Sequence, residues 1–328
     1  MKVLFIAPET RVRRFHNLDN LPADVTLVFV GSFPTLEEVI RQGADADFLI
    51  ADAVSTVSKE MIDAMPNLKL IHSEGVGYEG FDVKAATARG IYVCNCAGIN
   101  ASAVAEQAIL LMLAVLRHLV EGDDRVRSAQ QIETKNQYIM EGIPELGGLK
   151  VGLIGFGAIA KETAKKLRAF GSEVFYTGRR PAPKETEAAY GVKYLSLGDL
   201  LACCDIVSLH LASNKETFHY IGEAELLKFK PGAILINTAR GEIVDQEALV
   251  RALKDGRISG AGLDTLYPEP VQADNPLLNL PEALHYKVTF SPHIGGTTQQ
   301  TFYRAPVMIW ENIFACAEGR TPRNIVSK

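Results

Sequence analysis

The sequence predicts an α/β protein built on two doubly wound parallel sheets. Strand-like apolar runs alternate with amphipathic helical patterns along almost the whole chain, and this alternation is typical of parallel sheets with helices on both faces. The 328 residues exceed a typical single domain, so we expect two domains. A Gly-rich turn at Gly155–Ala160 opens the first strand–helix unit of the second sheet.

The first 98 residues contain five strand-like runs with helical patterns between them. The strand candidates are Val3–Ala7, Val25–Val30, Phe48–Ala51, Leu68–Ser73 and Ile91–Asn95, and helical patterns lie near 36–42, 58–64 and 83–89. Ligands gather at the carboxyl ends of parallel strands. The Gly75–Val76–Gly77 loop after the fourth run therefore offers backbone N–H groups to a carboxylate, although an ordinary strand-to-helix turn explains the same loop equally well.

Residues 99–120 predict one long helix. Asn100 or Ser102 is a suitable N-cap, and Ala103–Leu116 is apolar on nearly every face. A helix that is apolar all round is buried, so we expect it to pass between domains or into a subunit interface. The more polar residues 121–149 are expected to connect this helix to the second sheet.

The stretch Val151–Arg180 predicts a strand, a Gly-rich turn, a helix and a second strand. In this setting Gly155 permits a tight turn, Gly157 allows a pyrophosphate to approach the backbone, and the small Ala160 lets helix and strand pack closely. The helix N-terminus then supplies N–H groups to the phosphates. Glycines also occur in purely structural turns, but the surrounding pattern favours dinucleotide binding.

Four more strand-like runs follow, which predicts six strands in two halves for the second sheet. These runs are Ile206–Leu211, Ala233–Thr238, Gly260–Asp264 and Val288–Ser291, with helical patterns at 197–203, 223–228 and 245–254. A last amphipathic stretch covers roughly residues 298–317, and the residues after it are too few for a third domain.

Composition and charge argue against several function classes. Hydrophobic content of 47% and charged content of 22% are those of an ordinary globular protein. A net charge of −5 offers no basic surface for nucleic acid. The longest uninterrupted apolar run, Ala108–Leu116, is too short to cross a bilayer, and the N-terminus has no cationic leader, so we expect neither a membrane protein nor a secreted one.

Cysteine usage favours a reducing compartment. Five cysteines, an odd number in a large chain, suit reduced thiols in the cytoplasm. Cys94 and Cys96 lie two apart in a strand-like stretch, but no second Cys/His pair stands at metal-ligand spacing. We therefore predict a cytoplasmic protein without a metal site.

Three ionisable residues, Arg240, Glu269 and His293, each follow the carboxyl end of a predicted strand in the second sheet. Taken singly, they are explained as a surface arginine, a loop carboxylate and a core histidine. Together, at one edge of a sheet, they supply an anion clamp, a carboxylate and an acid–base group that the carboxylate orients. This combination suits the reduction of a 2-oxo acid by a nicotinamide cofactor.

Several motifs, in the family's order, give the chain a resemblance to the D-isomer-specific 2-hydroxyacid dehydrogenase family, and within it to the glyoxylate/hydroxypyruvate reductase-like subgroup. The resemblance extends from the first strand to nearly the last helix. The motifs are Gly75–Val76–Gly77–Tyr78, Asn100 with Ser102–Glu106, Gly155–Ala160, Asn237–Gly241, Gly262–Asp264 leading to Glu269–Pro270, and Ser291–His293.

The resemblance implies a domain organisation and an assembly. Residues 1–98 plus 294–328 would form a flavodoxin-like substrate-binding domain that carries out catalysis, and residues 99–293 would form a Rossmann dinucleotide-binding domain. Members of the family are usually homodimers joined through the nucleotide domain and its long helix. We therefore expect a homodimer here.

The resemblance also implies a role for each motif residue. Arg240 would bind the carboxylate and carbonyl oxygen of the substrate, His293 would donate a proton to that oxygen, and Glu269 would pair with His293. Val76 and Gly77 would offer their N–H groups to the substrate carboxylate. The expected cofactor contacts are Gly155, Gly157, Ala158, Ile159, Gly178, Arg179, Arg180, Thr238, Ala239 and Asp264, the last through the nicotinamide carboxamide.

The end of the second strand in the nucleotide domain departs from the usual family pattern. NAD-dependent members have an Asp there to bind the ribose hydroxyls, whereas this chain has Gly178 followed by Arg179 and Arg180. Loss of the carboxylate removes repulsion toward a 2′-phosphate, and a guanidinium gives that phosphate a charged partner. A basic surface turn is the alternative. We expect NADP(H) to be preferred, with NAD(H) as the second choice.

The sequence thus predicts an NADPH-preferring oxidoreductase that converts a small 2-oxo acid, such as glyoxylate, hydroxypyruvate or pyruvate, to the D-2-hydroxy acid. Two rivals share the scaffold: a phosphite-type dehydrogenase and a dinucleotide-sensing corepressor. The corepressor is disfavoured because the sequence shows neither long tails nor basic patches. Arg240, Glu269 and His293 do not exclude it, since such proteins can keep all three.

Overall fold

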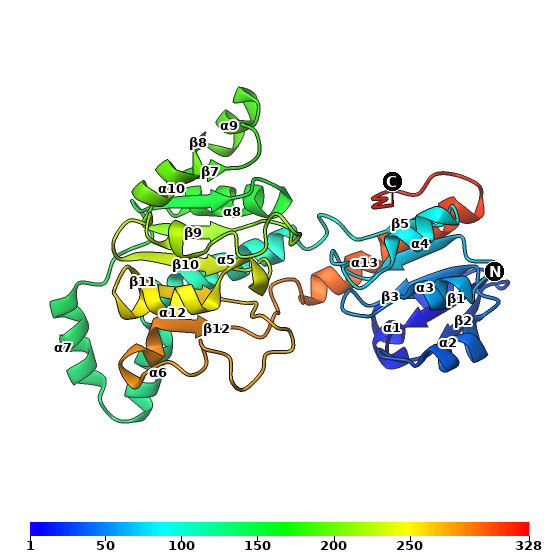
Figure 1. Cartoon of the computed structure of the whole chain (residues 1–328), viewed down its shortest axis with the longest axis horizontal. Helices are drawn as coiled ribbons and strands as arrows, with labels where there is room; N and C mark the ends of the chain where they lie inside the picture. The colour runs from blue at the N-terminus through cyan, green and yellow to red at the C-terminus, as the bar shows by residue number, and fades with distance from the viewer. Residues whose placement is uncertain (328) are drawn as a thin grey trace. The chain divides into compact units, whose positions relative to one another are not determined.

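The computed structural model describes residues 1–327, which divide into two compact units. Unit 1 contains Met1–Asn100 and the chain from Thr297 onward, and unit 2 contains Ala101–Gly296. Each unit is a parallel sheet with helices on both faces (Figure 1). The predicted α/β fold class with two doubly wound sheets is therefore confirmed.

The sheet of unit 1 has five parallel strands in the order β2-β1-β3-β4-β5, the order of a flavodoxin-like sheet. Each strand lies within two residues of the run that predicted it. The strands are β1 (Lys2–Ile6), β2 (Thr26–Phe29), β3 (Phe48–Ala51), β4 (Leu70–Ser73) and β5 (Tyr92–Cys94).

Helices cover both faces of this sheet because its strands are apolar on both sides. One face packs against α1 (Glu9–Phe15) and the long α13 (Gln299–Ala317) through residues such as Val12 and Trp310. The other face packs against α2 (Leu36–Gly43), α3 (Lys59–Asp63) and α4 (Val83–Ala88). The sequence did not predict α1, which buries only Val12 along its length, nor the 3-10 turn at Leu18–Asn20.

The sheet of unit 2 has seven parallel strands in the order β12-β11-β10-β9-β6-β7-β8. The order places β6 beside β9, and the carboxyl ends of these central strands form the usual ligand edge of a doubly wound sheet. The strands are β6 (Lys150–Ile154), β7 (Glu173–Thr177), β8 (Val192–Tyr194), β9 (Ile206–Leu209), β10 (Ala233–Asn237), β11 (Ile258–Leu263) and β12 (Val288–Phe290).

The prediction of six strands was wrong by one. The additional strand β8 pairs with β7 at the edge of the sheet, after a helix α9 (Lys184–Tyr190) that was not predicted either. Both elements are short, and Glu187 is the only buried residue of α9. Elements that bury so little carry a weak hydrophobic pattern.

Two helical layers enclose the seven-stranded sheet. One contains α5 (Ala101–Leu116) and α8 (Ala158–Ala169). The other contains α10 (Leu197–Cys203), α11 (Glu223–Leu226) and α12 (Gln246–Lys254) (Figure 1). Two further 3-10 turns occur at Gly241–Ile243 and Glu282–Lys287.

The expectation of one helix over 99–120 with a connection over 121–149 was wrong. The helix α5 ends at Leu116, and α6 (Leu119–Arg127) continues at an angle of 57°. The break lies at His118, whose backbone is left-handed with φ 50°, a conformation that cannot continue a right-handed helix. The supposed connection contains α6 and α7 (Gln131–Glu141).

In the described residues, no single helix is both long and apolar enough to cross a membrane; the bent pair α5 and α6 meets those two criteria only when taken together.

Candidate active site

The turn after β6 has the geometry of a phosphate-binding loop. Gly155 has φ 94°, and a Cβ there would lie 2.4 Å from the carbonyl oxygen of His210, so only glycine fits. Gly157 is the N-cap of α8 and gives the helix no side-chain cap, while a Cβ at this position would meet nothing within 4 Å. The first N–H groups of α8, including those of Ala158 and Ile159, therefore face open space that suits an anion.

The carboxyl end of β10 carries Arg240 on a tightly bonded turn. The Asn237 side chain accepts a hydrogen bond from the Ala239 N–H at 3.0 Å and donates to the Arg240 carbonyl at 2.8 Å. Thr238 lies between them with its hydroxyl buried and without a partner in residues 1–327. A buried hydroxyl in that state marks a position where a ligand group would complete the hydrogen bonding, so this strand end fits a dinucleotide.

His293 and Glu269 lie together, as the sequence predicted for their loops. The distance from His293 Nδ1 to Glu269 Oε1 is 2.6 Å, and the two side chains are 33% and 47% exposed. With Nδ1 engaged by the carboxylate, Nε2 is the ring nitrogen left to exchange a proton, and it has no partner in the described residues. Arg240 reaches the same region through Gly241, which packs directly against Leu266 in the loop that leads to Glu269.

Asp264 holds the turn that contains His293. The carboxylate of Asp264 accepts hydrogen bonds from the Ser291 hydroxyl, from the Ile294 N–H at 3.1 Å and from the Gly295 N–H at 2.8 Å. Its backbone carbonyl accepts a bond from the His293 N–H at 2.8 Å. Asp264 is 2% exposed, so this structural role stands beside the cofactor contact expected from the sequence, which did not reveal it.

The loop after β4 in unit 1 is anchored through its backbone carbonyl groups. Its three consecutive carbonyls accept hydrogen bonds from the body of unit 1: Gly75 from the Cys96 N–H, Val76 from the Asn95 side chain at 2.7 Å, and Gly77 from Ser73 Oγ at 2.6 Å. The N–H groups of Val76 and Gly77 have no acceptor within residues 1–327. Such an arrangement of adjacent free N–H groups is suited to an anion.

Glu74, which precedes this loop, is not a free anion. Its carboxylate pairs with Arg11 of α1 and lies 3.3 Å from His16 Nε2, and Arg11 also binds Asp52 at 2.6 Å. Arg11 thus joins the carboxyl ends of β3 and β4. Neither this cluster nor the role of Asn95 was recognised in the sequence, because the partners come from separate elements.

The end of β7 has an open, basic turn. Gly178 has room for a side chain, since a Cβ there would meet only the Arg180 carbonyl oxygen, at 4.0 Å. Arg179 and Arg180 are exposed, and neither guanidinium pairs with a carboxylate in the described part of the chain. The turn can therefore present positive charge to a ligand.

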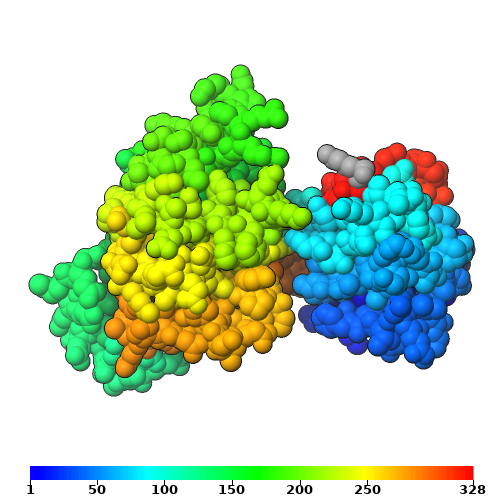
Figure 2. Space-filling model, in the orientation of Figure 1, coloured from blue at the N-terminus to red at the C-terminus, as the bar shows by residue number. Residues whose placement is uncertain are grey.

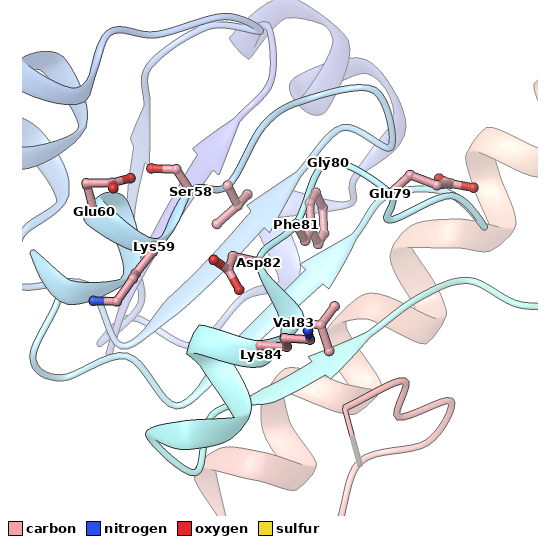
Figure 3. Close-up of a pocket in the computed structure, with 10 residues that line it drawn as sticks. Ser58, Lys59, Glu60, Glu79, Gly80, Phe81, Asp82, Val83 and Lys84 are labelled. Carbon is pink, nitrogen blue, oxygen red and sulfur yellow. The ribbon is translucent and has the colours of Figure 1, made fainter. Parts of the chain in front are cut away.

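None of the predicted site residues lines the shallow hollow on unit 1 (Figure 3). Ser58 and Asp82 in its wall cap α3 and α4 through bonds of 3.4 and 2.9 Å. Lys59, Glu60 and Lys84 are exposed around it. These polar groups serve the two helices and their solvation. In residues 1–327, no group of His, Cys, Asp or Glu is arranged to hold a metal ion.

Comparison with known proteins agrees with this geometry. The family described as "D-isomer specific 2-hydroxyacid dehydrogenase, NAD binding domain" matches residues 109–295. The glyoxylate reductase of Thermofilum pendens is 39% identical over 295 residues, which cover 90% of this chain and 85% of that protein. The glyoxylate reductase of Thermococcus litoralis is 40% identical over 294 residues, 88% of this chain and 86% of the relative.

Solved structures show the same fold. A glyoxylate reductase from Paecilomyes thermophila aligns with a TM-score of 0.83 and 31% identity, covering 99% of this chain and 98% of its own. The apo D-mandelate dehydrogenase of Rhodotorula graminis aligns with a TM-score of 0.88 and 26% identity, covering 100% and 98%. The chain therefore belongs to the D-isomer-specific 2-hydroxyacid dehydrogenase family, as an oxidoreductase that acts on the CH–OH group of its donors with a nicotinamide dinucleotide.

Proposed function

We propose that this protein is an NADPH-preferring reductase that converts a small 2-oxo acid to the D-2-hydroxy acid, with glyoxylate or hydroxypyruvate as leading substrates and pyruvate after them. The observation that carries the proposal is the 2.6 Å pair of His293 and Glu269, on the same sheet edge as Arg240. The relatives named glyoxylate reductase support the choice of substrate.

The chemistry assigns one task to each residue. Glu269 accepts the Nδ1–H of His293, which fixes the ring and leaves Nε2 to donate its proton to the carbonyl oxygen of the substrate. The guanidinium of Arg240 binds the substrate carboxylate and carbonyl oxygen, and the N–H groups of Val76 and Gly77 bind the carboxylate. A bound reduced nicotinamide supplies the hydride.

In this proposal unit 2 binds the dinucleotide and also supplies Arg240, Glu269 and His293 to the reaction. Unit 2 is the dinucleotide-binding domain, with the phosphates at Gly155, Gly157, Ala158 and Ile159 and further contacts at Thr238, Ala239 and Asp264. The Oδ2 atom of Asp264 accepts only one hydrogen bond within residues 1–327, so it retains capacity for the nicotinamide carboxamide. Unit 1 is the substrate-binding domain.

The preference for NADPH rests on the turn Gly178–Arg180. Its two exposed guanidinium groups have no carboxylate partner in the described residues, and Gly178 places no acidic group beside them. A 2′-phosphate would therefore meet attraction without repulsion. An acyclic imino acid reductase, 27% identical with a TM-score of 0.84, was solved in complex with NADPH, which supports the same choice.

The protein would act as a homodimer in the cytoplasm. Several large apolar side chains of α6 and α7 are exposed, including Val126, Ile132, Ile139 and Met140. Exposed apolar clusters of this kind mark contact surfaces. All five cysteines are free thiols, as a reducing compartment would leave them.

A reductase screen tests the proposal. Glyoxylate, hydroxypyruvate and pyruvate are supplied with NADPH and, separately, with NADH, and nicotinamide absorbance is followed; phosphite with each oxidised cofactor tests the phosphite-type alternative. We expect turnover of a 2-oxo acid with a higher kcat/KM for NADPH. Cofactor binding without turnover of any substrate would favour the corepressor alternative.

Variants tie the activity to the site. His293→Ala and Arg240→Ala should each lower kcat/KM by about a hundredfold or more while cofactor binding persists. His285→Ala is the matched control, because this exposed histidine precedes β12 at the opposite edge of the sheet. Wild-type rates in His293→Ala or Arg240→Ala would contradict the proposal.

A further inference from the structure

We infer that Gln107 of α5 is a positioning residue for His293, acting through Ser291 and Asp264. The inference deepens the proposed function and rests on it, because it takes His293 as the proton donor. Gln107 does not contact the reacting groups in this scheme. It determines how firmly the turn that carries His293 is held.

The backbone of His293 needs such support. His293 has φ 54°, a left-handed conformation that is strained for a non-glycine residue. The N–H groups of His293, Ile294 and Gly295 all donate to Asp264, the first to its carbonyl and the others to its carboxylate. The His293 N–H also lies 3.0 Å from the Ser291 carbonyl oxygen, so Asp264 and Ser291 together hold the strained turn.

The position of the Asp264 carboxylate depends in turn on Ser291. The Ser291 hydroxyl donates to Asp264 Oδ1, and Gln107 Nε2 donates to the Ser291 oxygen at 2.8 Å. A hydroxyl has one proton to give. Since the Asp264 carboxylate can only accept, this proton goes to Asp264, and the amide of Gln107 fills the acceptor side of the same hydroxyl. Gln107 thus holds the Ser291 hydroxyl in place at the start of a chain of bonds that ends at the His293 turn.

The packing of α5 brings Gln107 to this place. Gln107, Leu111 and Val115 are spaced four residues apart and form one ridge of the helix. A Cβ at Gly260 would lie 2.6 Å from Val115 Cγ1, and a Cβ at Gly262 would lie 2.8 Å from Leu111 Cβ. The helix therefore lies directly on β11, which requires glycine at both positions.

The same ridge extends past the carboxyl end of β11. A Cβ at Gly295 would lie 3.5 Å from Gln107 Cβ and Cγ and 2.9 Å from Asp264 Oδ2. Gln107 is thus the polar member of a ridge that otherwise packs apolar side chains on a strand, and its amide meets Ser291 where the strand has ended. An apolar residue would fill this space equally well, so packing alone does not explain the glutamine.

Three variants separate positioning from packing. Gln107→Met keeps the size of the side chain and removes the donor; Gln107→Glu keeps the shape and replaces the donor by an acceptor; Ser291→Ala removes the middle of the chain. Gln42→Met in α2, a half-buried glutamine of unit 1 outside the proposed site, is the matched control. Measured quantities are kcat, KM for each substrate, and Tm.

We expect Gln107→Met to lower kcat about tenfold, as small misplacements of a catalytic group do, while KM for the cofactor and Tm stay near wild type. Gln107→Glu should lower kcat further, because the new carboxylate competes with Asp264 for the Ser291 hydroxyl proton. Gln107→Met added to Ser291→Ala should cause little further loss, since both act through one chain of bonds. Gln42→Met should have wild-type kcat.

Results that would refute the role of Gln107 differ from those that would refute the proposed function. Wild-type kcat in both Gln107 variants, in an enzyme that reduces 2-oxo acids, would refute the positioning role and leave the proposed function intact. A loss of activity that follows a fall in Tm, or additive losses in the double variant, would also refute it. A wild-type protein that reduces no 2-oxo acid would refute the proposed function itself.

Discussion

Gly155 and Gly157 lie two positions apart, and each is a glycine for a different physical reason. Gly155 combines φ 94° with a backbone neighbour that a Cβ would strike at 2.4 Å. Gly157 has ordinary φ, and a Cβ there would meet nothing within 4 Å. The first glycine is required by the fold, and the second leaves space in front of the helix N-terminus for a ligand.

This difference gives a paired prediction. Gly155→Ala should destabilise unit 2 by roughly 2 kcal/mol or more, because the backbone of His210 must move and the left-handed conformation is strained. Gly157→Ala should leave Tm unchanged and weaken cofactor binding. Thermal unfolding and a fluorescence titration with NADPH measure the two effects. Equal Tm losses would show that both glycines are structural.

The turn at Gly178 predicts the cofactor. Gly178→Asp with Arg179→Ser should shift the ratio of kcat/KM for NADPH and NADH toward NADH, since the new carboxylate repels a 2′-phosphate and accepts a bond from a ribose hydroxyl. The open space at Gly178 makes the change sterically mild, so Tm should hold. Steady-state kinetics with both cofactors measure this ratio. An unchanged ratio would contradict the assignment of the NADPH preference to this turn.

At the scale of elements, α6 and α7 are where the structure differs most from the sequence-based prediction. Their stretch was expected to be a polar connection, yet it forms two helices after a sharp break at His118. Figure 2 shows α7 as a protrusion at the edge of unit 2. Ile139 and Met140 on α7 are 64% and 86% exposed, which is costly unless another surface covers them.

We therefore predict that α7 forms part of the contact in the homodimer proposed above. Ile139→Glu combined with Met140→Glu should convert the dimer to a monomer, because two charges would have to be buried without partners. Leu227→Glu, at an equally exposed apolar residue after α11, is the control and should remain dimeric. Analytical ultracentrifugation measures both. A dimeric double variant would place the contact elsewhere.

At the scale of the whole molecule, each unit contains a histidine whose pKa is lowered in the folded protein. In unit 1, His72 donates from Nδ1 to the Ser73 carbonyl and accepts from Asn312 at Nε2. In unit 2, His210 pairs with Ser208. Burial lowers the pKa of His72 and of His210 from the usual 6.5 to about 4.

Both units should lose stability on mild acidification. Below pH 6.5 these histidines are protonated in the unfolded chain but stay neutral in the folded protein. The free energy of unfolding is therefore highest above pH 6.5 and falls as the pH is lowered toward 4. The loss approaches roughly 3 kcal/mol for each histidine. Thermal midpoints across this range measure it, and His72→Gln should flatten part of the decline. Midpoints that stay constant down to about pH 5 would contradict the prediction.

The sequence by itself determined the fold class and most of the strands. Strands such as Phe48–Ala51 are buried on both faces of a parallel sheet. Such strands are continuous apolar runs, which can be recognised locally in the sequence. It also pointed to Arg240, Glu269 and His293, because parallel strands bring their carboxyl ends to one edge. The topology brings the loops of His293 and Glu269 to one edge, and the resemblance to the family implied that these two side chains pair; they lie 2.6 Å apart.

Only the tertiary structure decided how the site is held. Gln107 and Ser291 are 184 positions apart, and neither the Asp264 network nor the Asn95 bond to Val76 repeats with any period along the chain. The left-handed residue His118 likewise separates α5 from α6, although the apolar residues Leu119 and Val120 follow it directly in the sequence. The periodicity of apolar residues indicates which face of an element is buried. It does not indicate which distant side chain contacts that face, because that depends on how the elements pack.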